Sequence, residues 1–218
     1  MALKSRITTR IPLRLSLSLL LFILTGLCLH ASSASAVGSK VNQPNFADFS
    51  QIVQNGQKEV LRGVYVDSVL ALPIVQQPEG KAIYISNNDG EVTQFGMASQ
   101  YGNVGLLAHN HKAGKSFVRL TVGQEVQLIY GDGRVETFVI KTVLKFQAMQ
   151  PTNPNSSFKN LDKDEILTAT EMFNRVYEGY YHLTFQTCIA ADGKWSWGRL
   201  FVIAIPKENA QTTDYQRY

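Results

Sequence analysis

Residues 125–144 read EVQLIYGDGRVETFVIKTVL, two runs rich in β-branched and aromatic residues on either side of a glycine turn. Gly131 and Gly133 can adopt the positive φ angles that a tight turn between two strands requires. The stretch therefore predicts a β-hairpin, with one strand at residues 125–130 and its partner at 134–144.

Runs of the same kind lie on both sides of this hairpin, separated by turn signals. Further strands are expected at residues 60–66, 68–75, 82–86, 92–97, 104–109, 180–187 and 199–205. Apolar residues at helical spacing predict a short helix at 46–53 and a longer one at 164–178. Asp162 or Asp164 would cap the longer helix, and Gly179 would end it. The fold class is therefore mainly β, a barrel or sandwich with a few short helices.

The first 36 residues have the layout of a secretory signal peptide. Basic residues precede a nearly continuous apolar run at 15–29, and Ala34-Ser35-Ala36 supplies the small residues that a signal peptidase requires. As a helix, this run would span only about 22 Å, against about 30 Å for the hydrocarbon core of a bilayer. Cleavage near Ala36 is therefore favoured over a retained anchor, and the chain is expected to work outside the cytoplasm, secreted or membrane-associated.

The rest of the chain reads as one domain with a lead-in and a tail. Residues 37–58 are expected to form a lead-in helix and linker, residues 59–206 the barrel, and residues 207–218 a polar tail. Outside the signal the chain has 17 basic and 17 acidic residues, which leaves no positively charged surface for phosphate groups. Nucleic acid is therefore not an expected partner.

Cleavage near Ala36 would also remove Cys28, and Cys188 would then be the one cysteine of the exported part. Exported proteins usually oxidise their cysteines in pairs, so an unpaired thiol calls for an explanation. One interpretation is a buried, unreactive thiol, because free cysteine packs as a small hydrophobe. The other is a nucleophile.

Three residues with complementary chemistry are expected at strand ends. Cys188 ends the run at 182–188, Arg199 begins the next strand, and His109 ends the strand at 104–109. A cysteine nucleophile needs a neighbouring imidazole or another cation that favours its thiolate, and acyl transfer needs a donor that holds the developing oxyanion. One cysteine, one histidine and one arginine can supply that set.

The same residues resemble those of the sortase family of cysteine transpeptidases, with the chain as a divergent member. Residues 184–188, TFQTC, resemble the family's TLxTC signature with Phe185 in place of the leucine. Residues 198–204, GRLFVIA, are similar to the segment that carries the active arginine. Residues 107–110, LAHN, resemble the strand end that carries the histidine, although Ala108 stands where a glycine is common. With the opening strands at 64–74, the resemblance covers roughly residues 60–206.

The resemblance implies a closed eight-stranded β-barrel and a two-step reaction on the peptide sorting signal of an exported protein. Cys188 would attack a peptide carbonyl and form a thioester, while His109 acts first as acid and then as base. Arg199 would orient the substrate and stabilise the oxyanion, and Thr187 would contribute to substrate binding. The acyl group would pass to an amine on the cell surface or in a pilin-like subunit. No cofactor is implied, and no matching residues allow a calcium dependence to be carried over.

Other side chains near these residues support weaker hypotheses. His111 competes with His109 for the catalytic role, but it lies two residues beyond the strand end. The two histidines could contribute to a metal site, yet no further ligand has metal-binding spacing, so no metal is expected. His182 is expected to be a hydrogen-bonded structural residue, and Asp132 and Glu136 of the hairpin are expected to be solvated.

Two other functions remain as alternatives. A cysteine hydrolase on the same barrel, such as a thiol protease, would use the same three residues and let water resolve the thioester. An exported binding module without activity would hold Cys188 buried and inert. Transfer to an added amine distinguishes a transpeptidase from the hydrolase, and reaction of Cys188 with a mild thiol reagent argues against the inactive module.

Overall fold

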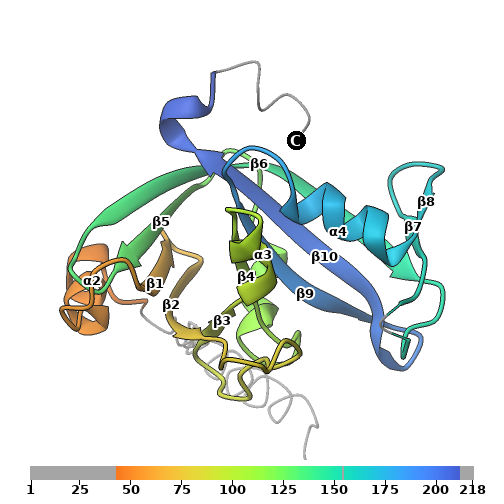
Figure 1. Ribbon diagram of the computed structural model, residues 1–218, viewed down its shortest axis with the longest axis horizontal. Coiled ribbons are helices and arrows are strands. Elements are labelled where there is room, and N and C mark those ends of the chain that lie inside the picture. The colour runs from red at the N-terminus through yellow and green to blue at the C-terminus, as the bar shows by residue number, and fades with distance from the viewer. Residues whose placement is uncertain (1–42, 154, 212–218) are drawn as a thin grey trace, which may run out of the picture. The chain divides into compact units, whose positions relative to one another are not determined.

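The computed structural model describes residues 43–153 and 155–211 (Figure 1). The chain divides into two compact units, Met1–Val41 and Asn42–Tyr218, and every described residue belongs to the second. The expected signal peptide at 1–36 and residues 212–218 of the expected tail lie outside the described residues. Within the described ranges, no helix combines the length and the apolar character that crossing a membrane requires.

The second unit consists mostly of strands. They are β1 Leu61–Val66, β2 Leu70–Gln76, β3 Val92–Gln94, β4 Val104–Leu107, β5 Glu125–Tyr130, β6 Val135–Ala148, β7 Phe158–Asn160, β8 Ile166–Leu167, β9 Leu183–Ala191 and β10 Lys194–Pro206. The helices are short: α2 Phe46–Val53, α3 Gly96–Gln100, α4 Ala169–Tyr177, and the 3₁₀ helices η1 Ala113–Arg119 and η2 Lys207–Asn209. The hairpin predicted at 125–144 and the helix predicted at 46–53 are both present.

Eight of these strands close into a barrel. In hydrogen-bonding order they are β10, β9, β4, β3, β2, β1, β5 and β6, and β6 pairs in turn with β10. This closing pairing runs from Gly198↔Gln147 to Pro206↔Phe138, along most of β10. β7 and β8 continue the sheet from β6 outside the circle. The mainly β fold with a closed eight-stranded barrel, which the resemblance implies, is confirmed.

Side chains alternate between the inside and the outside of the barrel along each strand. On β10, Leu200 and Val202 belong to the buried cluster that fills the barrel. Phe201 and Ile203, between and after them, belong to a second buried cluster on the outer face. Helix α4 covers this outer cluster and contributes Val176 to it (Figure 1). This alternation decides which residues around the candidate site point outward.

The helix expected at 164–178 begins later, at Ala169. The chain from Ile166 forms β8 and pairs with β7, so Ile166 is exposed and does not line a buried helix face. Thr168 is the N-cap: its hydroxyl accepts from the backbone amide of Glu171, whose carboxylate accepts in return from the backbone amide of Thr168. This capping box fixes the start of the helix in place of the expected aspartates.

The strand expected at 82–86 is absent, although the residues are β-branched and aromatic. The side-chain amide of Gln77 donates to the carbonyl oxygens of Ala82 and Tyr84, at 3.0 Å each. A side chain thus binds the carbonyl groups that a neighbouring strand would otherwise bind. The segment between β2 and β3 is a loop that these hydrogen bonds fix, and the prediction of a strand there is wrong.

The last two strands are longer than expected. β9 continues past Cys188, and β10 begins before Arg199. Between the strands, Asp192 and Gly193 form a two-residue turn in which both have positive φ, 51° and 70°. Cys188 and Arg199 therefore lie within the paired part of this hairpin and not at strand ends, although the register shifts between Lys194 and Gly198.

Candidate active site

Cys188 lies on the outer face of β9. Phe185 belongs to the cluster inside the barrel, whereas the hydroxyl of Thr184 points outward and donates to the carbonyl oxygen of Val176 in α4, at 2.7 Å. By the two-residue alternation of a strand, Cys188 points outward as Thr184 does. The thiol is unpaired and partly exposed. A substrate can therefore approach it from outside the barrel.

Arg199 lies directly opposite Cys188 in the antiparallel register of β9 and β10. Opposite residues of antiparallel strands have Cβ atoms about 4.5–5.5 Å apart, on the same face of the sheet. Phe201, two residues after Arg199, belongs to the outer cluster, which confirms that this face of β10 is the outer one. The guanidinium and the thiol therefore share one face.

His109 reaches the same place from the other side of β9. β4 runs parallel to β9, and the last pair between them is Leu107 with Gln186. The backbone amide of Ala108 still donates to the carbonyl oxygen of Gln186 at 3.3 Å, so His109, two residues past the end of β4, follows this register toward the level of Cys188. Ala108 belongs to the cluster inside the barrel, so the next residue, His109, faces outward. Cys188 and Arg199 thus lie opposite each other on β9 and β10, and His109 follows the end of β4, the neighbour of β9 on its other side. Figure 1 shows these three strands.

Thr187 links the histidine and cysteine strands. Its side chain is only 3% exposed, and its hydroxyl donates to the carbonyl oxygen of Ala108 at 2.8 Å. Gly114 packs against this bond: a Cβ there would lie 2.3 Å from the Thr187 hydroxyl and 2.7 Å from the carbonyl oxygen of His109. The backbone on either side of the candidate nucleophile is therefore fixed. The Thr187 hydroxyl is already bound inside the protein. Substrate binding by Thr187 stays a prediction.

The loop after β4 contacts the β9–β10 hairpin. The rings of His109 and His111 stack, with centroids 5.5 Å apart and planes at 23°. The edge of Trp195 meets His111, with centroids 5.6 Å apart. The side-chain amide of Asn110 donates to the carbonyl oxygen of Trp195 at 2.9 Å. The hairpin and the loop thus contact each other through Asn110 and His111, and His111 contacts both the His109 ring and Trp195.

The electrostatic surroundings of His109 favour its neutral form. Burial lowers the pKa of His109 below its ordinary value of 6.5, and positive charge on His111 and Lys112 lowers that pKa further. A neutral imidazole can accept a proton at pH 7. His109 is therefore suited to act as a base in the resting protein.

Arg199 is anchored by part of its guanidinium only. One nitrogen, Nη1, donates to the carbonyl oxygens of Ser196 and Gly198, at 3.0 and 2.9 Å. The guanidinium carbon lies 5.8 Å from the ring centroid of Phe158. Nε and Nη2 form no hydrogen bond with the described residues, so they are available to an oxygen of the substrate. Five N–H donors in a planar group suit such an oxyanion.

Among the described residues, the third histidine is His182, which lies away from the candidate site. His182 is fully buried, with Nδ1 2.7 Å from the carbonyl oxygen of Tyr180 and Nε2 2.9 Å from that of Val176. The prediction of a hydrogen-bonded structural histidine is confirmed. In residues 43–153 and 155–211, no three or more His, Cys, Asp or Glu side chains gather as metal ligands do.

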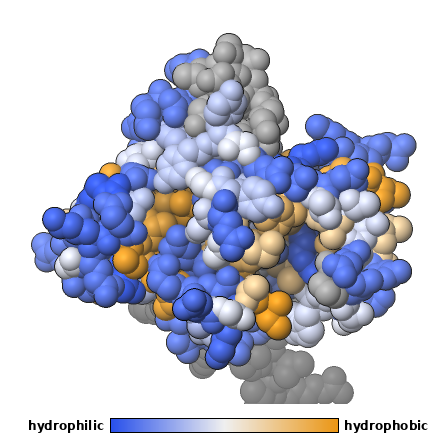
Figure 2. All heavy atoms as spheres, in the orientation of Figure 1, coloured by the Kyte–Doolittle hydropathy of each residue, from blue (hydrophilic) through white to orange (hydrophobic). Residues whose placement is uncertain are grey.

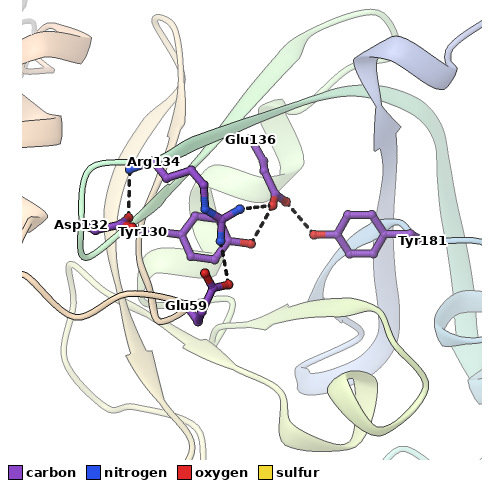
Figure 3. Close-up of polar contacts among 6 residues, drawn as sticks. All are labelled: Glu59, Tyr130, Asp132, Arg134, Glu136 and Tyr181. Atoms are coloured by element: carbon purple, nitrogen blue, oxygen red, sulfur yellow. Dashed lines mark hydrogen bonds and ion pairs between the residues drawn. The ribbon is translucent and has the colours of Figure 1, made fainter.

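Glu136 is only partly solvated, and its carboxylate has protein partners that the sequence-based expectation did not include. Figure 3 shows its carboxylate between Tyr130 and Tyr181, whose hydroxyls donate to it at 3.0 and 2.7 Å. Arg134 donates to the same carboxylate at 2.6 Å, and the Glu136 side chain is 29% exposed. Asp132, by contrast, is exposed as expected. The carboxylate connects the β5–β6 hairpin to the segment that leads into β9.

Sequence reasoning missed the residues that hold the site together. Gly114, Asn110 and Trp195 act through contacts with residues that are distant along the chain, such as the bond from Asn110 to Trp195. No local sequence pattern predicts such contacts. The polar loop after His109 and the two tryptophans before Arg199 are the only signals in the sequence that point toward this region.

Comparisons with known proteins give similarity of structure alone. No protein-family model matches the sequence, and no curated protein matches it. The structure is similar to solved sortases. Among them, sortase A of Listeria monocytogenes is 11% identical over 68% of this chain and 87% of that chain, with a TM-score of 0.43. Sortase C1 of Streptococcus agalactiae is 15% identical over 78% of this chain and 77% of that chain, with a TM-score of 0.43.

A further solved structure is sortase C of Clostridium perfringens SM101, which is 14% identical over 72% of this chain and 80% of that chain, with a TM-score of 0.40. Such low values say nothing of activity. The barrel is established by the strand pairing, and any activity has to be argued from the residues on its outer face.

Proposed function

We propose that this chain is a sortase-type cysteine transpeptidase that cleaves a peptide sorting signal and transfers the acyl part to an amine. The observation that supports the proposal is the register of β4, β9 and β10, in which Arg199 pairs with Cys188 and His109 comes two residues after the last pair of β4 with β9. A nucleophile, a neutral base and a cationic hydrogen-bond donor are the parts that acyl transfer requires.

In the first step, the sulfur of Cys188 attacks the carbonyl carbon of the scissile peptide bond, and the thiol proton passes to His109. The carbonyl oxygen becomes an oxyanion, which the available N–H groups of Arg199 stabilise. The C–N bond then breaks, and His109 returns the proton to the departing amine. A thioester on Cys188 results.

In the second step, an incoming amine attacks the thioester carbonyl. His109, neutral again, takes a proton from the amine nitrogen, and Arg199 stabilises the second oxyanion. The C–S bond breaks, and the thiolate of Cys188 recovers the proton from His109. The net reaction exchanges one amine for another on the same acyl group, so it needs no cofactor.

Product analysis tests this proposal. Purified protein comprising residues 37–218 would be incubated with sorting-signal peptide libraries, with and without an added amine, and the products separated by mass. The proposal predicts an amide with the added amine, no product with Cys188→Ala, and a large loss with His109→Ala. Arg199→Lys keeps the charge but loses the planar donor group, and we expect it to lose most of the activity.

The cysteine hydrolase gives a different product in the same experiment. Release of the free acid alone, at a rate that the amine does not change, would replace the transpeptidase with the hydrolase. Retention of product formation in Cys188→Ala would exclude both.

The proposal extends to location and partners. Export through residues 1–36 would bring the enzyme to the cell surface, where sorting signals and amine acceptors such as pilin-like subunits occur. Fractionation of cells that express the full chain tests this extension, because a processed form outside the cytoplasm is expected. Retention of the whole protein in the cytoplasm would contradict it.

A further inference from the structure

A shallow apolar pocket, wide open to solvent, lies beside His109, outside the set of three candidate catalytic residues. Its volume is about 690 Å³, and it is lined by seven residues between Gly80 and Asn87 together with His109. Neither Cys188 nor Arg199 contributes to this lining. The pocket is therefore adjacent to the base, and not to the groups that would meet the acyl carbonyl.

The wall of this pocket is an ordered loop. The Gln77 side chain donates to the carbonyl oxygens of Ala82 and Tyr84 and accepts from the backbone amide of Gly96, each at 3.0 Å. The backbone amide of Tyr84 also donates to the carbonyl oxygen of Lys81 at 2.9 Å. These bonds hold the loop from β2 to the start of α3 before any substrate arrives.

The loop at 80–87 presents apolar side chains to solvent. Ile83 is 97% exposed, which is rare for an isoleucine, and Tyr84 beside it is partly exposed. Figure 2 shows a hydrophobic area at the lower edge of the view, over the loops that lie below β2 and β3 in Figure 1. An ordered apolar surface of this kind beside a candidate catalytic base is suited to bind an apolar side chain.

The position of His109 indicates which part of the substrate would bind in the pocket. Under the proposed function, His109 exchanges protons with the amine nitrogen, both of the departing fragment and of the incoming acceptor. A pocket lined by His109, but by neither Cys188 nor Arg199, is next to the residue that carries this nitrogen. Lys81 in the same lining disfavours additional positive charge on the occupant.

We infer that the loop at 80–87 is a specificity site for the amine component, and that Ile83 and Tyr84 bind an apolar side chain close to its amino group. The inference rests on the proposed function and names the chemistry of the acceptor: a primary amine on a residue with an apolar side chain. The acyl part of the donor makes no use of this pocket.

Competition between acceptors tests the inference. A thioester donor that leaves no amino-acid residue behind would be offered together with leucinamide and serinamide, and the ratio of the two amide products measured. The parent protein is expected to favour leucinamide, and Ile83→Ser to reduce this preference about 10-fold, the effect of one lost apolar contact in a pocket. Ile52→Ser is the matched control, because Ile52 is 71% exposed on α2, and it should leave the ratio unchanged.

The rate of thioester formation distinguishes the two sides of the scissile bond. It should be equal in the parent and in Ile83→Ser, because the donor in this assay carries no amine component. An unchanged product ratio in Ile83→Ser, or a slower thioester formation, would overturn the inference.

Binding without catalysis separates this inference from the proposed function. In Cys188→Ala, leucinamide is expected to shift the NMR signals of the 80–87 loop and of the His109 ring, and serinamide to shift them less. These shifts without any transfer by the parent protein would refute the proposed activity but support the binding site. Transfer by the parent without these shifts would refute the binding site alone.

Discussion

The hydroxyl of Thr187 donates to the carbonyl oxygen of Ala108 at 2.8 Å, and this bond ties β9 to β4 immediately before both Cys188 and His109. The two candidate catalytic residues thus follow the two partners of one buried hydrogen bond. A change in this bond should therefore alter the geometry of the site as well as the stability of the fold.

Replacing Thr187 by Val should remove this link at nearly constant volume. The carbonyl oxygen of Ala108 would lose a buried donor, which costs about 1–3 kcal/mol of stability. Thr187→Ser keeps the hydroxyl and should lose less than half of that. Urea unfolding measures both variants, and equal stability of the two would show that the hydrogen bond contributes nothing.

Gly114→Ala should disturb the site through crowding. The new methyl group would lie 2.3 Å from the Thr187 hydroxyl and 2.8 Å from the carbonyl oxygen of Ala108, so the backbone must shift, at a cost of about 1–3 kcal/mol. Gly90→Ala is the control, since no atom lies within 4 Å of a Cβ there. We expect slower labelling of Cys188 in the Gly114 variant only. Labelling at the parent rate would argue against a rigid link between the strands.

His111 should depress the pKa of His109 through its charge. In His111→Phe the aromatic stack remains but the positive charge is lost, so the pKa of His109 should rise toward 6.5 and the acid limb of the activity profile should move to higher pH. NMR titration of the imidazole measures this pKa directly. A pKa that stays at the parent value would leave burial and the charge of Lys112 as its causes.

The lowered pKa of His109 also determines how the stability of the fold changes with pH. The unfolded chain takes up a proton on His109 at about pH 6.5, whereas the folded protein does so only at lower pH. The stability that neutral His109 allows is therefore present above pH 6.5 and is lost as pH falls below it. His111→Phe removes only the smaller cause of the lowered pKa, whereas His109→Gln removes the titrating group itself. The loss of stability at low pH should therefore be reduced more in His109→Gln than in His111→Phe.

Glu136→Gln should destabilise the protein without affecting the candidate site. Two tyrosine hydroxyls and Arg134 donate to this carboxylate, so we expect a loss of about 1–3 kcal/mol. Glu59→Gln is the control: Glu59 pairs with the same Arg134 at 2.9 Å but is 80% exposed, so its loss should stay below about 1 kcal/mol. Denaturant titration compares the two.

The candidate site should tolerate that change because it is remote. Phe138, two residues after Glu136, pairs with Pro206, and Arg199 lies seven residues before Pro206 on β10. At about 3.3 Å per residue this separation is roughly 23 Å. Thiol labelling of Cys188 in Glu136→Gln should therefore match the parent rate.

Local patterns predicted those parts of the fold that depend on local interactions. The 125–130 strand, its glycine turn and the 46–53 helix could be predicted because turn chemistry and apolar spacing decide them. The strand at 82–86 could not be excluded, since the side chain of Gln77 binds the carbonyl groups that a partner strand would have bound. The late start of α4 depends on pairing between β7 and β8, which its own apolar spacing does not reveal.

The candidate site divides in the same way. Chemistry and resemblance pointed to His109, Cys188 and Arg199. The strand register pairs Cys188 with Arg199, and His109 follows the end of the neighbouring β4, while their catalytic roles stay predictions. The supports of the site, such as Gly114 against Thr187, are contacts across more than 70 residues. These contacts can be identified only from the structure of the folded chain.

The most direct test is the intact mass of the protein comprising residues 37–218 after exposure to a peptide-based, thiol-directed electrophile. The parent would be compared with Cys188→Ala, His109→Ala and Arg199→Ala. One assembled active site predicts a single adduct on the parent, none on Cys188→Ala, and strongly reduced labelling in the other two variants. Labelling that is independent of His109 and Arg199, or that never occurs, would contradict the account and leave a sortase-like barrel without sortase chemistry.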